Sequence, residues 1–420
     1  MGKKEKAPCL RFKDTNGKDY PAWEQRKLGE VAATFGYGLN AAAKSFDGRH
    51  KYIRITDIDE STRRFLCSSL TSPDIDFEEA APYRLAEGDV LFARTGASVG
   101  KSYRYVRTDG EVYFAGFLIR FRFKDKEAAE FVFQNSLTAK FQNFIKTSSQ
   151  RSGQPGINAQ QFSGYQIAVP NSEERERIGS FFSRLDTAIT LHQRKLETLK
   201  KLKRTLLQKM FPKEGESVPE LRFPGFTDPW EQRKFDEMFD CTIPSNTLSR
   251  AELSYDEGTI LNVHYGDVLI KYGAVLDVQK DEIPRIPQKS RDDFKGALLQ
   301  DGDVIIADTA EDETTGKACE VGNLQGSALV SGLHTMVCRP RSQMAPGFFG
   351  YYLNSGSYHR QLLPLMQGIK VLSLSRSNIQ KTVVSYPAKV GEQQLIADYF
   401  GHLDHLITLH QRKCNWLKKL

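Results

Sequence analysis

The feature that most constrains the fold is a long helical pattern between residues 171 and 211, which contains no proline. Its apolar side chains recur at alternating steps of four and three residues, and therefore lie along one stripe of a helix. Such a stripe requires a partner helix, and at about 1.5 Å per residue this helix is roughly 58 Å long. Asn171 is the expected N-cap, with Glu174 completing a capping box. The predicted seam comprises Ile178, Phe182, Leu185, Ile189, His192, Leu196, Leu199, Lys203, Leu206 and Met210.

A second copy of this helix near the end of the chain is the predicted partner. The segment LDTAITLHQRK at residues 185–195 recurs as LDHLITLHQRK at residues 403–413, with nine identities in eleven positions. His192 and His410 take the same place in the two copies, where a polar pair can fix the register of packed helices. The second seam comprises Ile396, Phe400, Leu403, Ile407, His410, Cys414 and Leu417.

The repeat extends beyond the helices and predicts two similar units. The shared segments are LRF at 10–12 and 221–223, WEQRK at 23–27 and 230–234, GDV at 88–90 and 302–304, and GK at 100–101 and 316–317. Each unit then consists of a linker, a globular domain and a long helix. The predicted boundaries are an N-terminal linker at 1–30, a first domain at 31–170, a first helix at 171–211, a linker at 212–238, a second domain at 239–387 and a second helix at 388–420.

The globular domains have the pattern of a mixed α+β fold. Strands are expected at 52–58, 89–93, 117–123, 259–263, 268–270, 303–307 and 335–339, and helices near 128–145 and 346–363. The second domain connects the two long helices and is roughly 40 Å across. Because that is shorter than the helix, an antiparallel helix pair is favoured over a parallel one. Such a pair places the domains at opposite ends, related by a pseudo-two-fold axis.

Composition narrows the function classes. The net charge of +7 and the pI near 8.9 permit a nucleic-acid partner. No apolar run reaches the roughly 18 residues of a membrane span, and the N-terminus lacks a signal-peptide pattern. The six cysteines are scattered, which fits a reducing cytoplasm. They contain no CxxC pair, which argues against a structural zinc site. We therefore expect a cytoplasmic protein without a membrane partner.

Catalytic motifs are not found in the sequence. The segment GASVGKS at 96–102 is one residue short of a phosphate-binding loop. The whole sequence contains no (N/D)PP(Y/F) methylation motif, glycine-rich cofactor loop or helicase motif. Asp74 with Asp76 is weak evidence for a nuclease site. The spacing of His402, His405 and His410 does not make a metal-binding face. We expect neither a catalytic site nor a bound cofactor or metal.

Candidate DNA contacts are the basic and amide side chains of the two domains, because such groups bind phosphates and base edges. The lysine of each GK pair is expected to reach a DNA phosphate. In the first domain the candidates are Arg49, Lys51, Arg54, Arg94, Lys101, Arg104, Arg151, Gln154, Asn158 and Gln160. In the second domain they are Lys271, Lys317, Lys370, Arg376 and Asn378.

The order of these motifs resembles the specificity subunit of type I restriction–modification systems over nearly the whole chain. The resemblance rests on the WEQRK and GDV segments, the two variable domains and the duplicated LD-x₂-IT-LHQRK helices. It implies two target recognition domains, each reading one half of a bipartite double-stranded DNA site, with the helices setting the spacing. It also implies docking of methyltransferase subunits, expected to number two, through which restriction subunits join. S-adenosylmethionine, ATP and Mg²⁺ would then be used by those partners.

Two other classes stay open from the sequence. One is an enzyme, either a nuclease or a nucleotide hydrolase with an unrecognised site, and turnover by the isolated chain would identify it. The other is a coiled-coil scaffold that binds only protein, which predicts no DNA binding even in an assembled complex.

Overall fold

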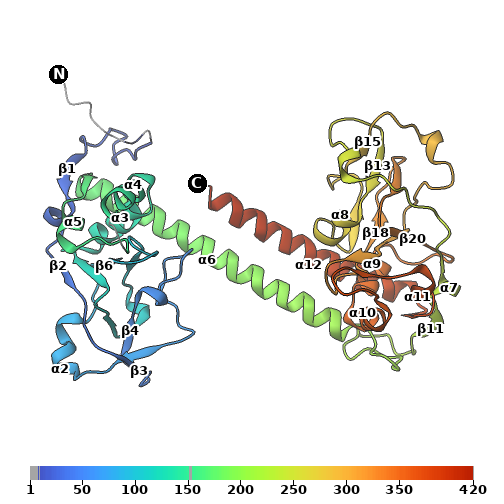
Figure 1. Ribbon diagram of the computed structural model, residues 1–420, viewed down its shortest axis with the longest axis horizontal. Coiled ribbons are helices and arrows are strands. Elements are labelled where there is room, and N and C mark those ends of the chain that lie inside the picture. Colours follow the sequence, from blue (N-terminus) through green and yellow to red (C-terminus); the bar gives the residue numbers. More distant parts are fainter. Residues whose placement is uncertain (1–7, 9, 151–153, 420) are drawn as a thin grey trace. The chain divides into compact units, whose positions relative to one another are not determined.

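The computed structural model describes residues 8, 10–150 and 154–419, and it divides into two compact units (Figure 1). Unit 1 comprises Met1–Ala188 and unit 2 comprises Ile189–Leu420. The boundary lies inside helix α6 (Ser172–Lys209), so each unit contains part of the first long helix. Within the described ranges, no helix is both long and apolar enough to cross a membrane.

Unit 1 is built around an antiparallel sheet with the strand order β2-β9-β6-β7, beside a parallel pair, β4 with β8. Its strands are β1 (Glu24–Lys27), β2 (Thr34–Tyr37), β3 (Ala43–Ser45), β4 (Lys51–Ile53), β5 (Thr71–Pro73), β6 (Asp89–Ala93), β7 (Ser102–Arg104), β8 (Val112–Phe114), β9 (Leu118–Arg122) and β10 (Gln166–Val169). Its helices are α1 (Leu28–Val31), α2 (Phe77–Ala80), α3 (Lys126–Ser136), α4 (Ala139–Ser148), α5 (Ala159–Ser163) and the first part of α6, with 3-10 turns η1 (Ile55–Asp57), η2 (Ala81–Tyr83) and η3 (Arg107–Asp109).

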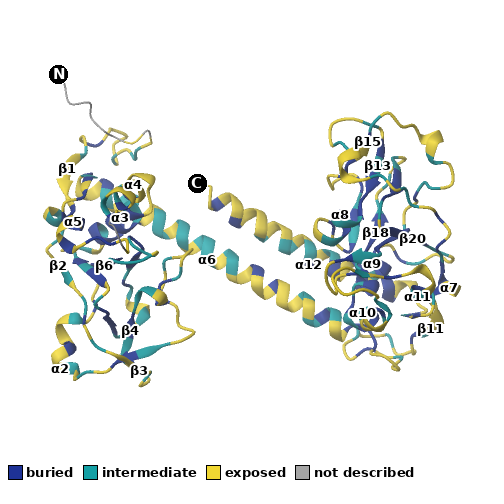
Figure 2. Cartoon of the chain, in the orientation of Figure 1, coloured by how far each residue is buried: buried dark blue, intermediate teal, exposed yellow. Residues whose placement is uncertain are grey.

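Strand β6 lies between two apolar clusters, because successive side chains of a strand point to opposite faces. All of its residues are buried (Figure 2). Val90 and Phe92 belong to the cluster that also contains side chains of α3, α4 and α5. Leu91 and Ala93 belong to the cluster on the other face. The end of β6 is therefore held firmly, and the residues that follow it start from a fixed position.

Unit 2 contains a five-stranded sheet, β12-β20-β16-β18-β14, and a three-stranded sheet, β15-β13-β19. Its strands are β11 (Glu231–Lys234), β12 (Phe239–Asp240), β13 (Ile260–Val263), β14 (Val275–Asp277), β15 (Arg285–Ile286), β16 (Val304–Ala307), β17 (Thr309–Ala310), β18 (Ala318–Gly322), β19 (Ala328–Ser331), β20 (Thr335–Pro340), β21 (Leu372–Ser373) and β22 (Val383–Tyr386). Its helices are the second part of α6, α7 (Phe235–Met238), α8 (Tyr265–Ile270), α9 (Phe348–Leu353), α10 (Gly356–Leu362), α11 (Arg376–Ile379) and α12 (Val390–Leu417), with 3-10 turns η4 (Arg250–Glu252), η5 (Arg291–Phe294) and η6 (Leu363–Leu365).

The two units share one topology. The order β12-β20-β16-β18 in unit 2 matches β2-β9-β6-β7 in unit 1, and the parallel pair β13–β19 matches β4–β8. Helices α9, α10 and α11 follow in the same order as α3, α4 and α5, and each series leads through a final strand into a long helix. The predicted α+β class with an internal repeat is confirmed.

Some local predictions are wrong. The helix expected near 128–145 is two helices, because Thr138 caps a new helix, α4, after α3 has ended. The helix expected near 346–363 is divided in the same way into α9 and α10, with Ser355 as the second N-cap. The strand expected at 268–270 lies in helix α8, since a short apolar run does not distinguish the two structures. The other expected strands correspond to β4, which is shorter than expected, β6, β9, β13, β16 and β20.

The two WEQRK motifs form strands of the globular parts. Strand β1 pairs antiparallel with β10, and β11 pairs antiparallel with β22. In each unit the second strand of the pair directly precedes the long helix. The segments 1–30 and 212–238, which the sequence predicted as linkers, therefore each contribute a strand to the fold.

A buried carboxylate near the start of each long helix binds an arginine and a tryptophan. In unit 1, both oxygens of Glu174 accept hydrogen bonds from Arg11, at 2.9 and 2.7 Å, and Trp23 Nε1 donates to Oε2 at 3.0 Å. Asn171 accepts from the Glu174 backbone, as predicted for the N-cap, whereas the Glu174 side chain bonds Arg11 and Trp23. The LRF and WEQRK repeats thus supply the two partners of this carboxylate.

Unit 2 repeats this arrangement with Glu392. Arg222 donates to both of its carboxylate oxygens, at 2.7 and 2.8 Å, and Trp230 Nε1 donates at 3.3 Å. The Glu392 side chain is 1% exposed, and the pKa of Arg222 is raised, first of all by the hydrogen bond to Glu392. We call each such group of three side chains an Arg–Glu–Trp clamp.

In unit 2, α12 packs antiparallel to the second part of α6. His192 Nδ1 lies 2.9 Å from His410 Nδ1, and Lys203 Nζ lies 2.5 Å from Asp404 Oδ1. Increasing residue numbers in α6 therefore meet decreasing numbers in α12. The predicted antiparallel direction is confirmed, and the two histidines of the repeat lie side by side.

The predicted seam residues are not all covered in the same way. Ile178 lies in unit 1, where it packs against the core that contains α3 rather than against a second helix, because the globular part covers this turn. Partly buried seam residues are Phe182, Leu185, Ile189, His192, Lys203, Ile407 and His410. Buried seam residues are Leu196, Leu199, Leu206, Met210, Ile396, Phe400, Leu403, Cys414 and Leu417.

Replacing Glu392 by alanine is expected to destabilise unit 2 strongly. The substitution leaves Arg222, whose side chain is 11% exposed, without its carboxylate, and breaking a buried ion pair in this way costs about 3–5 kcal/mol. The measurement is the urea unfolding midpoint of Glu392→Ala. Asp398→Ala, which removes an exposed carboxylate from the same helix, is the control and should change the unfolding free energy by less than about 0.5 kcal/mol. Equal effects of the two substitutions would contradict the role of the clamp.

The helix pair is expected to weaken as the pH falls below about 6.5. Burial, and then the neighbouring His192, lower the pKa of His410 from its ordinary value of 6.5. A base whose pKa is lower in the folded state favours folding when neutral, so this stability is present above pH 6.5 and is lost on acidification. The urea midpoint of His410→Leu should therefore depend less on pH between 8 and 5.5 than that of the unsubstituted chain. His402→Leu, at an exposed position of the same helix, should leave the dependence unchanged.

Candidate nucleic-acid interface

A cavity of about 840 Å³ lies at the end of β6 in unit 1. Its walls come from the end of β2, the chain after β4, the turn after β6 and the turn before β9, so loops carried by four strands meet there. The polar and aromatic residues that line it are Tyr37, Asn40, Tyr52, Arg54, Thr56, Arg94, Thr95, Ser98, Phe117 and Gln154.

Arg94 is the cation held between two aromatic rings at this cavity. Its guanidinium carbon lies 4.9 Å from the centre of the Tyr37 ring and 5.9 Å from that of Phe117. Both rings are exposed, at 44% and 60% of their residue surface. No carboxylate of the described chain pairs with Arg94, and its buried Nε has no hydrogen-bond partner there. A guanidinium positioned by rings rather than by an acid keeps its donors available for a ligand.

Three other predicted cations of this domain already bond protein oxygens. Arg49 Nε lies 3.0 Å from Glu111 Oε2, and Lys51 Nζ donates to the carbonyl of Asp109. Arg54 lines the cavity, but Asp57 accepts two hydrogen bonds from it, at 2.8 and 3.0 Å. The carboxylates offset the charges of Arg49 and Arg54, and the carbonyl occupies a donor of Lys51.

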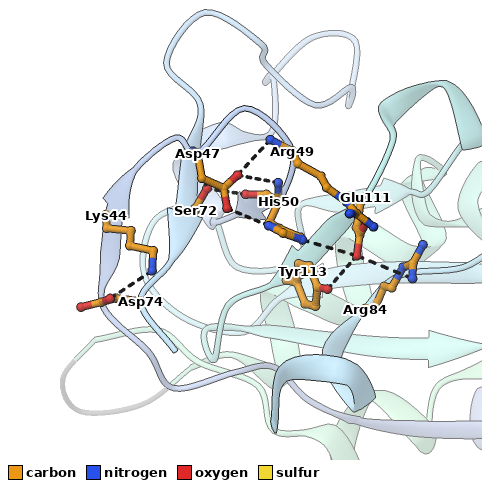
Figure 3. A network of polar contacts seen from close by, with 9 residues as sticks. All are labelled: Lys44, Asp47, Arg49, His50, Ser72, Asp74, Arg84, Glu111 and Tyr113. Carbon is orange, nitrogen blue, oxygen red and sulfur yellow. Dashed lines mark hydrogen bonds and ion pairs between the residues drawn. The ribbon is translucent and has the colours of Figure 1, made fainter. Parts of the chain in front are cut away.

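Arg49 belongs to a polar network in which Glu111 is the shared acceptor (Figure 3). Arg84 lies 3.6 Å from Glu111 Oε1, and the hydroxyl of Tyr113 donates to that oxygen at 2.9 Å. Burial, together with Glu111, raises the pKa of Tyr113 to about 12. Burial alone would raise the pKa of Glu111, but the hydrogen bonds from Tyr113 and Arg49 bring it below its ordinary value. Glu111 is therefore ionised and neutralises part of the local positive charge.

The lysines of the two GK pairs point into the protein. Lys101 Nζ lies 2.6 Å from Glu60 Oε2 and donates to the carbonyl of Ile58 at 3.2 Å. Lys317 Nζ donates to the carbonyls of Leu269 and Tyr272, at 2.8 and 3.3 Å, and burial lowers its pKa. Internal acceptors thus hold both ammonium groups in the structure, which disfavours the predicted contacts of Lys101 and Lys317 with DNA phosphates.

The glycines of the GK pairs are also structural. Gly100 and Gly316 have φ near +82° and +88°, which glycine adopts without strain. A Cβ atom at Gly100 would lie 2.6 Å from Ile145, and one at Gly316 would lie 2.6 Å from Leu362. The segment 96–102 therefore forms a turn into strand β7 and does not begin a helix, as a phosphate-binding loop would.

The remaining candidates of the first domain are spread over its surface. Arg104 pairs with Glu130 at 2.7 Å and lines a different cavity beside α3 and α6. Gln154 lines the cavity at the end of β6, Asn158 caps α5, and Gln160 is exposed on α5. Arg151 lies outside the described residues.

In the second domain, the predicted residues lie on several segments of the chain. Lys271 pairs with Glu282 at 2.8 Å and lies 4.8 Å from the ring of Tyr255. Lys370 and Arg376 are exposed, near β21 and at the start of α11. Asn378 donates to the carbonyl of Leu365 at 3.2 Å.

A polar cluster at the end of β16 was not predicted from the sequence. Asp308 Oδ1 accepts from Thr309 Oγ1 at 2.7 Å and lies 3.5 Å from His334 Nδ1. The ring of Tyr265 lies 5.3 Å from that of His334 in an edge-to-face arrangement. The repeat contained the necessary signal, because Ala-Asp-Thr at 307–309 aligns with Ala-Arg-Thr at 93–95. In neither unit do the described residues include three or more groups arranged to hold a metal ion.

Comparison with known proteins gives a consistent result. Residues 21–201 match the family model of the type I restriction modification DNA specificity domain. The type I restriction enzyme MjaVIII specificity subunit of Methanocaldococcus jannaschii is 21% identical over 343 residues, which cover 79% of this chain and 76% of that protein. The putative MjaX specificity subunit of the same organism is 26% identical over 228 residues, covering 52% of this chain and 53% of that protein.

A solved structure shares the fold. It is the S subunit of the type I restriction–modification system from M. genitalium, which superposes with a TM-score of 0.57 at 12% identity. The match covers 94% of this chain and 93% of the other. At this identity the likeness concerns the fold alone, and it extends over both units.

Replacing Lys101 by methionine is expected to lower stability and to leave the salt dependence of DNA binding unchanged. The substitution removes the internal hydrogen bond to Ile58 and the ion pair to Glu60, at a cost of about 1–3 kcal/mol. A phosphate contact would instead reduce the slope of log K against log salt concentration by about 0.9. Urea unfolding and binding titrations at several salt concentrations measure the two effects. Lys44→Met, at an exposed position of the same domain, is the control for stability.

Proposed function

We propose that this chain, which carries a type I restriction modification DNA specificity domain and is related over most of its length to type I specificity subunits, is the DNA-sequence specificity subunit of such a complex. The observation that carries the proposal is one fold built twice, with different side chains at equivalent loop positions. A protein that reads two different half-sites requires this combination of a common frame and two different reading surfaces.

Each globular domain reads one half of a bipartite double-stranded site. In the first domain, the cavity at the end of β6 supports this role, because it presents a guanidinium, two exposed aromatic rings and an amide from adjacent loops. Sequence is read by hydrogen bonds to base edges, whereas phosphate contacts only position the protein. The paired long helices hold the two domains at a set spacing along the DNA, of the order of one to two turns at about 34–36 Å per turn.

The long helices also provide the surface on which methyltransferase subunits dock, two per specificity subunit, and restriction subunits join through them. The chain itself is non-catalytic, so S-adenosylmethionine, ATP and Mg²⁺ are used by the partner subunits. Exposed apolar side chains on α12, such as Leu409 and Trp416, support a protein partner at that helix. The complex acts on DNA in the cytoplasm, where it is associated with the nucleoid.

The test is the methylated motif in DNA from cells that contain this chain and its methyltransferase partner. A bipartite motif is expected. Exchange of residues 31–170 for the matching segment of a related subunit should change one half of the motif, and exchange of residues 239–387 should change the other half. A motif that lacks two halves, or the absence of any specific methylation, would contradict the proposal. The isolated chain should not hydrolyse ATP or cleave DNA.

A further inference from the structure

The residue that follows the central strand occupies the same structural position in both units. The backbone N–H of Arg94 donates to the carbonyl of Phe117 at 3.1 Å, and that of Asp308 donates to the carbonyl of His334 at 3.1 Å. The carbonyl of Arg94 accepts from Ile157 at 2.9 Å. The carbonyl of Asp308 accepts in the same way at 2.8 Å from the residue that precedes the N-cap of α11. Arg94 and Asp308 are therefore equivalent.

The two equivalent side chains have opposite hydrogen-bonding character. Arg94 has only donors, and the rings of Tyr37 and Phe117 position them at the cavity. Asp308 has only acceptors when ionised, and one of its oxygens already accepts from Thr309. Its side chain is 25% exposed, and no arginine or lysine of the described chain pairs with it. Within the described chain, Arg94 therefore has no acidic residue as its partner, and Asp308 has no arginine or lysine as its partner.

The surroundings of Asp308 are held in a strained conformation. His334 has a φ of +53°, a left-handed conformation that a residue other than glycine adopts at a cost. This conformation places its ring 3.5 Å from Asp308 and beside Tyr265. His334 is also the equivalent of Phe117, because both carbonyls accept the corresponding hydrogen bond. In both units, then, an aromatic or imidazole ring stands next to the charged side chain.

We propose that this position is where each domain reads one base pair, with Arg94 donating to a guanine and Asp308 accepting from an exocyclic amino group. Arginine matches the two acceptors of guanine, O6 and N7. A carboxylate matches the amino group of cytosine N4 or adenine N6 and repels guanine O6. The inference rests on the proposed function and adds the reading residues and the chemical groups that they recognise.

The pattern of charges favours base contact over phosphate contact. A carboxylate at a phosphate would be repelled, so Asp308 gains a favourable partner on DNA only at a base donor. Arg94 occupies the equivalent place and has the same access, which makes a base edge its partner as well. Its nearest neighbours are aromatic rings, and the other arginine that lines the cavity, Arg54, is already paired with Asp57, unlike a cluster of free cations that follows the phosphate backbone.

The test compares the methylated motifs made by Arg94→Gln, Arg94→Lys and Asp308→Asn complexes with that of the unsubstituted complex. Loss of one good base contact reduces discrimination by about 5- to 150-fold. We expect Arg94→Gln to relax one guanine position in one half of the motif and Asp308→Asn to relax one cytosine or adenine position in the other half. The motif itself then identifies which of the two amino groups Asp308 recognises.

Arg94→Lys retains the charge and the contact with the rings, so it folds even if Arg94→Gln does not, and it should also relax the guanine position. Arg107→Gln and Asp292→Asn remove exposed charges from the same two domains and should leave the motif unchanged. Unchanged motifs for the Arg94 or Asp308 variants, or an equal loss of methylation at all sequences, would overturn the inference. Absence of a specific motif with the unsubstituted chain would instead contradict the proposed function.

Discussion

The structure depends on a buried carboxylate that joins three separate segments of each unit. Removing a charge from water costs several kcal/mol, about as much as a good partner returns, so Glu174 and Glu392 are tolerable only where a guanidinium and an indole N–H both reach them. The arginine comes from the segment before the domain, the tryptophan directly precedes the first paired strand, and the glutamate comes from the long helix. Because all three must meet, the clamp closes the domain and fixes the direction in which its helix leaves.

A second duplicated ion pair lies at the start of the central strand in each unit, β6 and β16. Asp89 accepts two hydrogen bonds from Arg122 of the neighbouring strand, at 2.6 and 2.7 Å, and Asp303 accepts two from Arg339 at 2.7 Å. Lys101 and Lys317 also have the same role in the two units, because each donates to a backbone carbonyl inside its domain. Polar residues that are the same in the two copies therefore belong to the frame. Polar residues that differ at equivalent positions, such as Arg94 and Asp308, lie where the common fold does not require one particular side chain.

The sequence alone predicted the duplicated fold, the helix pair and its antiparallel direction, because heptad spacing and an internal repeat are strong long-range signals. It did not predict that Lys101 is internal, since a lysine beside a glycine has the same pattern whether its acceptor is a phosphate or a carbonyl. The clamps were also missed, although their arginine, tryptophan and glutamate all lie within the repeated motifs. Pairing Arg11 with Glu174 requires knowledge that residues 163 positions apart are neighbours, which the fold supplies.

The 59 lysine and arginine residues overstate the number of cations that are available to DNA, because 52 acidic residues offset most of their charge. Arg49, Arg54 and Arg104 each pair with a carboxylate, and Arg122 is committed to the sheet. A cation that already neutralises an acid releases few counterions when DNA approaches, so under the proposed function these four arginines add little to non-specific attraction. Discrimination then depends more on a few base contacts, each contributing about 1–3 kcal/mol. Under the proposed function, the sequence preference then comes from the two globular domains rather than from the overall charge of the subunit.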